Sequence, residues 1–440
     1  MSDIGYVVFD DPENLGQGWA ARPKDDRASL IGGLHDLSSD TIWILNSEWD
    51  AMHSQQVDRH ALYRQCRYLG PSLPKVVADL GIPADAAPEQ ALWGARITQR
   101  VIDLYATAFG VDAGTVPPGR LVNAVRERLA PPDIQIPAVL DQALMDSSEM
   151  FDWLRAPPEE GVDVTLRIHP LHYTDLLLSA SVPDDQEEAV WVDNPPQTPT
   201  QEWVDANSPL LARVTVDQQN RLAAVLLNFG ATSDPNSGRR FVTHYELSRL
   251  IASGAVLRVH QVVKWPANPT RFDAPRKMIA RLMSEECGAF FASESVGLFA
   301  ELLWRGVCAR LVPPYGRKRR ARYRNLAAPF LHALGRIHCA TVAMAFIEDG
   351  FLVRRQGYGQ IGVLMREGDD WKGLADHCAR QRLVPPVFPA GRAIASYVPP
   401  SGIDPRDPFV TSLIMRARGL RSDLLNLDSS LSGWMARKIA

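Results

Sequence analysis

Residues 338–355 read HCATVAMAFIEDGFLVRR, two apolar runs on either side of Glu348-Asp349-Gly350. Asp-Gly between apolar runs is a strong hairpin signal, so this stretch predicts two antiparallel strands with an acidic tip. Residues 212–217 read ARVTVD, a short apolar strand that ends in Asp217. Two carboxylates on adjacent strands can hold two magnesium ions, which align a nucleophile and neutralise a transferring phosphate.

Asp217 and Asp349 are therefore the candidate catalytic residues and magnesium ligands, and Glu348 is a further catalytic candidate. A second interpretation of each acid stays open. Asp-Gly is the commonest hairpin turn, and an Asp after a strand is often a helix cap.

Positive charge gathers in one segment. No acidic residue occurs between Leu302 and Ile347, although the chain as a whole carries a net charge of −4. The residues expected to bind nucleic acid are Arg305, Arg310, Arg317, Lys318, Arg319, Arg320, Arg322, Tyr323 and Arg324. Arginine binds phosphate oxygens through two parallel hydrogen bonds, and aromatic rings stack on unpaired bases. The pattern predicts contact with DNA or RNA. The alternative is a solvated surface that pairs with the acidic stretch 183–188.

The chain has 440 residues, of which 46% are hydrophobic and 22% charged, as in ordinary globular proteins. Changes in pattern divide it into four regions, all within an α/β (α+β) fold class. These are a mostly helical region with a small strand element (1–155), strands plus an acidic Pro-rich linker (156–210), an α/β domain (211–370) and a helical region (371–440).

Several local elements follow from hydrophobic periodicity. Strands are expected at 4–10, 41–46, 163–169, 175–182 and 256–265. Helices are expected after Asp217 and at 244–254, 273–310, 318–335, 371–382 and 409–438. Residues 357–362 match GxGxxG, but the sequence that follows predicts another strand rather than the helix that a dinucleotide site needs.

The order of these elements resembles family B DNA polymerases. Over residues 210–370 it is similar to palm-containing proteins of actinobacterial plasmids and linear replicons, such as the telomere-associated replication proteins. Ser295–Ala300 resembles the motif before the family's hairpin, and Gly359–Asp369 resembles the stretch after it. The resemblance implies a palm-like core built on an antiparallel sheet, helical fingers and thumb-like elements, magnesium and a DNA partner.

Departures from the family pattern concern nucleotide binding. Leu222 stands where the family has a Tyr, and Ala289 stands where it has a Lys that grips the triphosphate. Lys277, on an earlier turn, is the remaining candidate for nucleotide binding. The family's Asp-Thr-Asp hairpin reads Ile347-Glu348-Asp349 here. The resemblance therefore implies a palm that keeps two acids and loses the side chains that bind the nucleotide.

Two further groups of residues have weaker patterns. Asp10 and Glu13 follow the first strand and could be a relic of the family's exonuclease acids. The histidines are scattered, and His169, His172, His338 and His377 show no metal-ligand spacing, so we expect surface or hydrogen-bonded core residues.

Five cysteines, odd in number and far apart, predict reduced thiols. With no secretory signal and no long apolar run, we expect a cytoplasmic protein without a membrane partner.

These patterns favour a nucleic-acid-binding protein with a degenerate polymerase-type palm, acting in replication or maintenance of a plasmid or mobile element. One alternative is an active, magnesium-dependent DNA polymerase or nucleotidyltransferase that uses Asp217 and Asp349. Another is a non-enzymatic subunit of a larger nucleoprotein assembly, for example one related to defence, which would bind other protein subunits.

Overall fold

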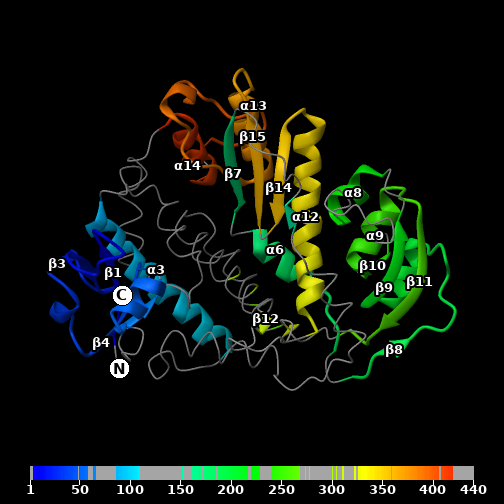
Figure 1. Ribbon diagram of the computed structural model, residues 1–440, viewed down its shortest axis with the longest axis horizontal. Coiled ribbons are helices and arrows are strands. Elements are labelled where there is room, and N and C mark those ends of the chain that lie inside the picture. Colours follow the sequence, from blue (N-terminus) through cyan, green and yellow to red (C-terminus); the bar gives the residue numbers. More distant parts are fainter. Residues whose placement is uncertain are drawn as a thin grey trace.

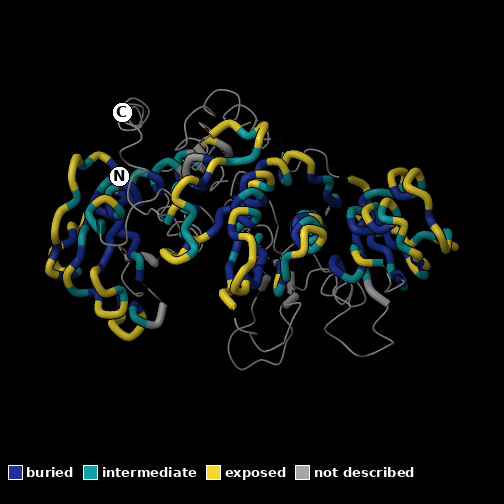
Figure 2. The backbone as a smooth tube through the Cα atoms, turned by 90° about the horizontal axis from the view of Figure 1, so that it is seen from above, coloured by how far each residue is buried: buried dark blue, intermediate teal, exposed yellow. Residues whose placement is uncertain are grey.

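The structure is a computed structural model of the 440-residue chain (Figure 1). It describes residues 3–47, 49–57, 63–65, 86–109, 151–152, 161–169, 172–184, 187–216, 220–227, 239–267, 273, 277, 300, 304, 310–311, 322–323, 326–357, 359–405 and 408–419. Three β-sheets of four or five strands organise these residues. Figure 2 shows buried backbone inside each sheet-containing part and exposed backbone on the outside.

The N-terminal sheet has the strand order β3-β2-β1-β4-β5. Its strands are β1 (Asp3–Phe9), β2 (Gly18–Ala21), β3 (Ser29–Ile31), β4 (Thr41–Leu45) and β5 (Tyr63–Gln65). β1 pairs antiparallel with β2 and parallel with β4, whose five residues are all buried. Helix α3 (Ala87–Phe109) packs on β1 and β2, while η1 (Leu34–Asp36) and α1 (Trp49–Ser54) flank β4 in the chain. The two predicted strands at 4–10 and 41–46 are confirmed.

The central sheet has the order β16-β7-β15-β14-β6, and all of its neighbouring strands are antiparallel. Its strands are β6 (Phe151–Asp152), β7 (Val162–Ile168), β14 (Leu352–Gly357), β15 (Gln360–Met365) and β16 (Leu383–Val384). The helices beside it are α6 (His172–Ser179), α12 (Ala328–Glu348), α13 (Trp371–Gln381) and α14 (Pro408–Ala417), with η5 (Ala390–Arg392) between the last two. The predicted linker region 156–210 thus supplies β7, an inner strand of this sheet.

The outer sheet has the order β10-β9-β11-β8 and is also antiparallel. Its strands are β8 (Val190–Trp191), β9 (Leu210–Val216), β10 (Arg239–Thr243) and β11 (Leu257–Lys264). Helices α8 (Arg221–Leu227) and α9 (His244–Ala252) cover the face that looks toward α12 in Figure 1, and α7 (Gln201–Asn207) packs on α9. The predicted helices at 221 and 244 and the predicted strand at 256–265 are confirmed.

Helix α12 lies between the central and outer sheets, where it packs on β14, α8 and α9 (Figure 1). By length and composition it could cross a membrane. However, the buried side chains of its C-terminal half, between Cys339 and Phe346, belong to the core that both sheets share. Arg336 of α12 also forms an ion pair with Glu246 of α9, and the Glu246 side chain is only 1% exposed. We therefore describe α12 as the core helix of the molecule.

The hairpin predicted at 338–355 is wrong, because its first half is α12 and only its second half is a strand, β14. A helix enclosed by protein on several sides is apolar around most of its circumference, so its 3.6-residue periodicity is lost. Glu-Asp-Gly is a helix stop rather than a strand turn. Asp349 is the C-cap, and Gly350 follows with φ of 87°, the left-handed conformation that ends many helices.

Two other expected elements differ. Residues 175–182, expected as a strand, belong largely to helix α6, in which Tyr173, Thr174 and Leu177 are buried at helical spacing. The helix expected at 318–335 begins only at Ala328. Before it lies a two-stranded ribbon of β12 (Arg310–Leu311) and β13 (Arg322–Tyr323), in which Arg310 lies opposite Tyr323. The segment between these strands, 312–321, lies outside the described residues.

Candidate functional site

The central sheet contains a strand end beside a hairpin turn, at a place other than the one predicted for Asp217 and Asp349. It is built by β7 and by the β14–β15 hairpin. Arg167 lies opposite Gln360, and the Ile168 backbone N–H donates to the Gly359 carbonyl at 2.7 Å. The turn fits closely against α6, because a Cβ on Gly359 would lie 2.2 Å from the Tyr173 hydroxyl oxygen. Gly359 also has φ of 73°, so two independent reasons require glycine there.

Three histidines gather where β7 ends, and we call His169, His172 and His338 the histidine edge. The rings of His172 and His338 stack with centroids 3.5 Å apart. The ring of His169 meets Phe409 of α14 edge-on at 5.1 Å, and its backbone N–H donates to the Arg382 carbonyl. No spacing in the sequence indicates this group, because α6 and α12 meet only through the tertiary fold.

The stacked His172–His338 pair is largely closed to water. Burial lowers the pKa of His338 to about 3, with a smaller contribution from His172. Burial likewise lowers the pKa of His172. The Nε2 atoms of both rings are buried and have no hydrogen-bond partner among the described residues. Asp175 is the carboxylate that approaches the pair, but it is 72% exposed and 3.9 Å from His172 Nδ1, too far for a hydrogen bond.

The strand that enters the hairpin turn adds an amide group. The turn residues 357–359 are Gly, Tyr and Gly. Gln356, the buried residue before the turn, donates from its side-chain amide to the Val225 carbonyl of α8 at 2.7 Å. Within the described ranges, no group of three or more His, Cys, Asp and Glu side chains is placed to hold a metal ion. Magnesium prefers several oxygen ligands, including carboxylates, so the residues at this edge do not fit the magnesium that the resemblance implies.

The predicted acids do not meet on one sheet. Asp349 ends helix α12, and its Oδ2 lies 2.5 Å from Nε2 of the buried His377 on α13. Glu348, beside it, is exposed. Asp217 lies outside the described residues, but β9, which it follows, belongs to the outer sheet. The prediction that Asp217 and Asp349 lie on neighbouring strands of one antiparallel sheet is wrong, because the apolar run before Asp349 is a helix.

The predicted basic residues are only partly described. Arg310, Arg322 and Tyr323 belong to the β12–β13 ribbon, and Lys277 is exposed. The others lie outside the described residues: Arg305, Arg317, Lys318, Arg319, Arg320 and Arg324. The pairing of β12 with β13 brings together the two chain segments that enclose Arg317–Arg320. Arg336 comes from the same segment without acidic residues, but it forms an ion pair with the buried Glu246.

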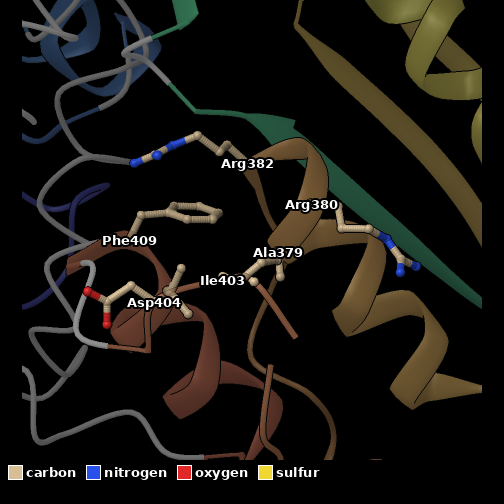
Figure 3. Close-up of a pocket in the computed structure, with 8 residues that line it drawn as sticks. Ala379, Arg380, Arg382, Ile403, Asp404 and Phe409 are labelled. Carbon is tan, nitrogen blue, oxygen red and sulfur yellow. The ribbon is translucent and has the colours of Figure 1, made fainter. Parts of the chain in front are cut away.

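A pocket of about 390 Å³ lies behind the histidine edge, between α13 and α14. Its lining residues are Ala379, Arg380, Arg382, Gly402, Ile403, Asp404, Phe409 and Val410. Figure 3 shows Arg382 beside Phe409, with Arg380 directed away from both. The Arg382 guanidinium lies 5.3 Å from the centre of the Phe409 ring, within the range of a cation–π contact. The same Phe409 ring contacts His169, so the pocket and the histidine edge share one wall.

The candidate acids beside the N-terminal sheet are exposed to solvent. Asp10 and Glu13 are exposed in the turn after β1. β4 is parallel to β1, so the carboxyl ends of both strands lie at one edge, where Asn46 accepts from the Phe9 N–H at 3.1 Å. The described part of this edge thus combines carboxylates from one strand with an amide from the other.

The sequence matches no protein-family model, and no curated protein matches it. Its structure is similar to that of Phi29 DNA polymerase complexed with primer-template DNA, with a TM-score of 0.47, 10% identity and coverage of 84% of this chain and 82% of that chain. It is also similar to the Phi29 DNA polymerase complex with single-stranded DNA, with a TM-score of 0.46, 11% identity and the same coverage of both chains.

Proposed function

We propose that this protein binds nucleic acid and uses a polymerase-type palm that has lost its metal site, in the replication or maintenance of a plasmid or mobile element. One observation carries the proposal. The strand end and hairpin turn where a two-metal palm needs carboxylates carry His169, a stacked His172–His338 pair and a Gly-Tyr-Gly turn. Neutral imidazoles in an apolar environment cannot replace several oxygen ligands for magnesium.

The basic segment supports the binding half of the proposal. It keeps eight cations between Arg305 and Arg324 without an acid, in a chain whose net charge is negative. Such a local excess of arginine attracts phosphate, and it does so without any transfer chemistry. The role in a plasmid or mobile element rests on the resemblance between residues 210–370 and the replication proteins of such elements.

The active-polymerase alternative has less support. Asp349 is engaged with His377 at a helix end, and its exposed neighbour Glu348 belongs to no group of three or more metal-binding side chains among the described residues. Transfer would then need a metal site that combines Asp217 with groups outside the described residues. No described contact favours the alternative of a subunit in a larger assembly.

The test is a binding titration run beside primer extension. Wild type should bind labelled DNA or RNA with an affinity that falls with salt, and it should extend no primer with magnesium or manganese. Replacing Arg319, Arg320 and Arg322 by Ala should weaken binding and reduce the log–log salt slope by about 0.7–0.9 for each lost phosphate contact.

A matched variant, Lys24→Ala with Arg27→Ala and Arg249→Ala, removes three exposed cations elsewhere and should leave both quantities nearly unchanged. Equal loss of affinity in the two triple variants would show that binding depends only on the net charge of the protein and not on the basic segment. Robust primer extension by wild type would overturn the proposal in favour of the polymerase.

A further inference from the structure

The outer sheet has one face in the core and one face directed away from it. Val214 and Val216 of β9 and Val259 and Val262 of β11 point into the core shared with α12. Because side chains alternate along a strand, the residues between them point the other way. α8 and α9 lie on the core side in Figure 1.

The outward side carries what we call the basic face: Arg213, Thr215, Phe241, Arg258, His260 and Gln261. Register places Phe241, Arg213 and Gln261 in one row across β10, β9 and β11. In the next row Thr215 lies between Arg239 and Arg258. None of these six residues is acidic, so the face has a positive charge on a chain with a negative net charge.

Contacts within the face hold its central arginine in place. The Arg213 guanidinium lies 6.0 Å from the centre of the Phe241 ring, and its Nη1 donates to Gln261 Oε1 at 3.4 Å. Thr215 Oγ1 and His260 Nε2 are 2.8 Å apart, and His260 is the extra residue at a bulge in β11. Phe241 is half-buried, while Arg258 and Gln261 are exposed. Arg213 and Arg258 form no ion pair with any carboxylate in the described ranges.

A second aromatic ring lies at the far side of the same face. Trp191 of the edge strand β8 is opposite Val263, in the row that also holds Leu211. Val263 and Leu211 are buried, whereas Trp191 is 44% exposed. Phe241 and Trp191 are on the first and last strands, three strand spacings of about 4.8 Å apart. A ligand that touches both rings must cross all four strands and pass Arg213 and Gln261, while Arg258 lies one row further from Trp191.

We infer that the basic face binds single-stranded nucleic acid, with a base stacked on Phe241, phosphates on Arg213 and Arg258, and Trp191 as a second stacking surface. This inference rests on the proposed function and adds to it a second site and a substrate class. Stacking needs an unpaired base, which a duplex does not offer to a flat sheet. The cations suit a phosphate backbone, whereas a purely acidic peptide would leave the two aromatic rings without a matching group.

The experiment compares face variants of the full chain with wild type in anisotropy titrations. The probes are a labelled oligo-dT, an oligo-U of the same length and a blunt DNA hairpin. Phe241→Leu should weaken binding of both single strands about tenfold, because it keeps the apolar volume but removes the stacking ring. Arg213→Gln with Arg258→Gln should reduce the log–log salt slope by about 1.4, at roughly 0.7 per contact on single strands. Binding of the hairpin should change little in both variants.

Arg249→Gln is the matched control, because it removes an exposed cation on α9 away from this face, and it should leave single-strand affinity unchanged. Thermal unfolding of each variant verifies the fold. If wild type binds single strands and the face variants bind them equally well, the inference fails and the proposed function stands. If wild type binds no nucleic acid, both fail. Competition by poly-glutamate that is as strong as oligo-dT and insensitive to Phe241→Leu would instead assign the face to an acidic protein.

Discussion

The central sheet buries its polar groups at the histidine edge, whereas the outer sheet turns its polar groups outward on the basic face. Both sheets pack on the same helix, α12. At the histidine edge, desolvation keeps His172 and His338 neutral. On the basic face, Arg258 and Gln261 stay in contact with water. The comparison teaches that the end of β7 lacks the carboxylates that magnesium needs, whereas the adjacent sheet presents arginine and an aromatic ring on one face.

The largest expected effect tests whether the two sheets form one cooperative unit. Arg336 of α12 pairs with Glu246, which also accepts from the Thr243 N–H and hydroxyl in a capping box at the start of α9. Arg336→Met should lower the free energy of unfolding by about 3 kcal/mol, because it leaves a buried carboxylate without its partner. Urea denaturation measures the change.

The control for Arg336→Met is the double variant Glu246→Gln with Arg336→Met. It should recover part of the loss, since no unpaired charge then stays buried. A loss below about 1 kcal/mol in Arg336→Met would mean that the outer sheet is joined to α12 only by apolar packing.

The second prediction concerns pH and the histidine edge. His338 has a folded-state pKa of about 3 and an unfolded value near 6.5, so between these values the unfolded chain binds the proton more tightly. Stability is therefore full above about pH 7 and falls as the pH drops through 6.5 toward 3. At pH 5 this residue alone should cost about 2 kcal/mol. His172, and His244 with a pKa of about 4, act in the same direction.

The measurement is the free energy of unfolding between pH 7.5 and 4.5, for wild type and His338→Gln. Below pH 6 the free energy of unfolding should depend less steeply on pH in the variant than in wild type. The difference in slope should be about 1.4 kcal/mol per pH unit, which corresponds to one proton. Asp175 and His169, the titratable neighbours of His172, stay in both proteins and so do not affect the difference. Identical slopes would show that His338 is solvated.

Gly359 tests how tightly the hairpin turn fits α6. Gly359→Ala should destabilise the protein by about 2 kcal/mol, because its φ is positive and its new methyl group meets the Tyr173 hydroxyl. Tyr173→Phe should recover part of that loss in the double variant. Gly391→Ala is the control, since a Cβ there meets nothing within 4 Å, and it should change stability by less than about 0.5 kcal/mol. Thermal unfolding measures the stability of both glycine variants.

Elements with a clean period could be predicted from the sequence. β1, β4, β7, β9 and β11 are apolar or alternating runs, and α8, α9 and α13 show helical spacing. α12 could not be predicted, because enclosure by two sheets removes the polar side that reveals a helix. Its Glu-Asp-Gly end then looks like a strand turn.

The candidate site was less accessible to prediction than the fold. β7 and β14 lie on either side of β15 and come together across a sequence separation of 190 residues, as in the contact between Arg355 and Thr165. The histidine edge depends on that pairing and on the docking of α6 against α12. The basic face similarly depends on the register of three strands. Local patterns therefore predicted arginine and tyrosine contacts in the segment 305–324, which stay a prediction, and they placed Asp349 beside a strand where the structure has the end of a helix.

The smallest expected effect concerns Asp349, which decides between the binding and catalytic interpretations. Its side chain is 58% exposed, and its contact with His377 joins the end of α12 to α13. Asp349→Asn keeps an oxygen that can accept from the imidazole, and partly exposed pairs contribute little, so stability should fall by less than about 1 kcal/mol.

Affinity for single-stranded DNA should stay equal to that of wild type, because Asp349 is on neither the basic face nor the histidine edge. If Asp349 instead held a magnesium ion for nucleotide transfer, the variant would abolish primer extension while binding stayed the same. Extension measured beside anisotropy on Asp349→Asn, with Glu348→Gln as the neighbouring control, therefore distinguishes a helix cap from a metal ligand.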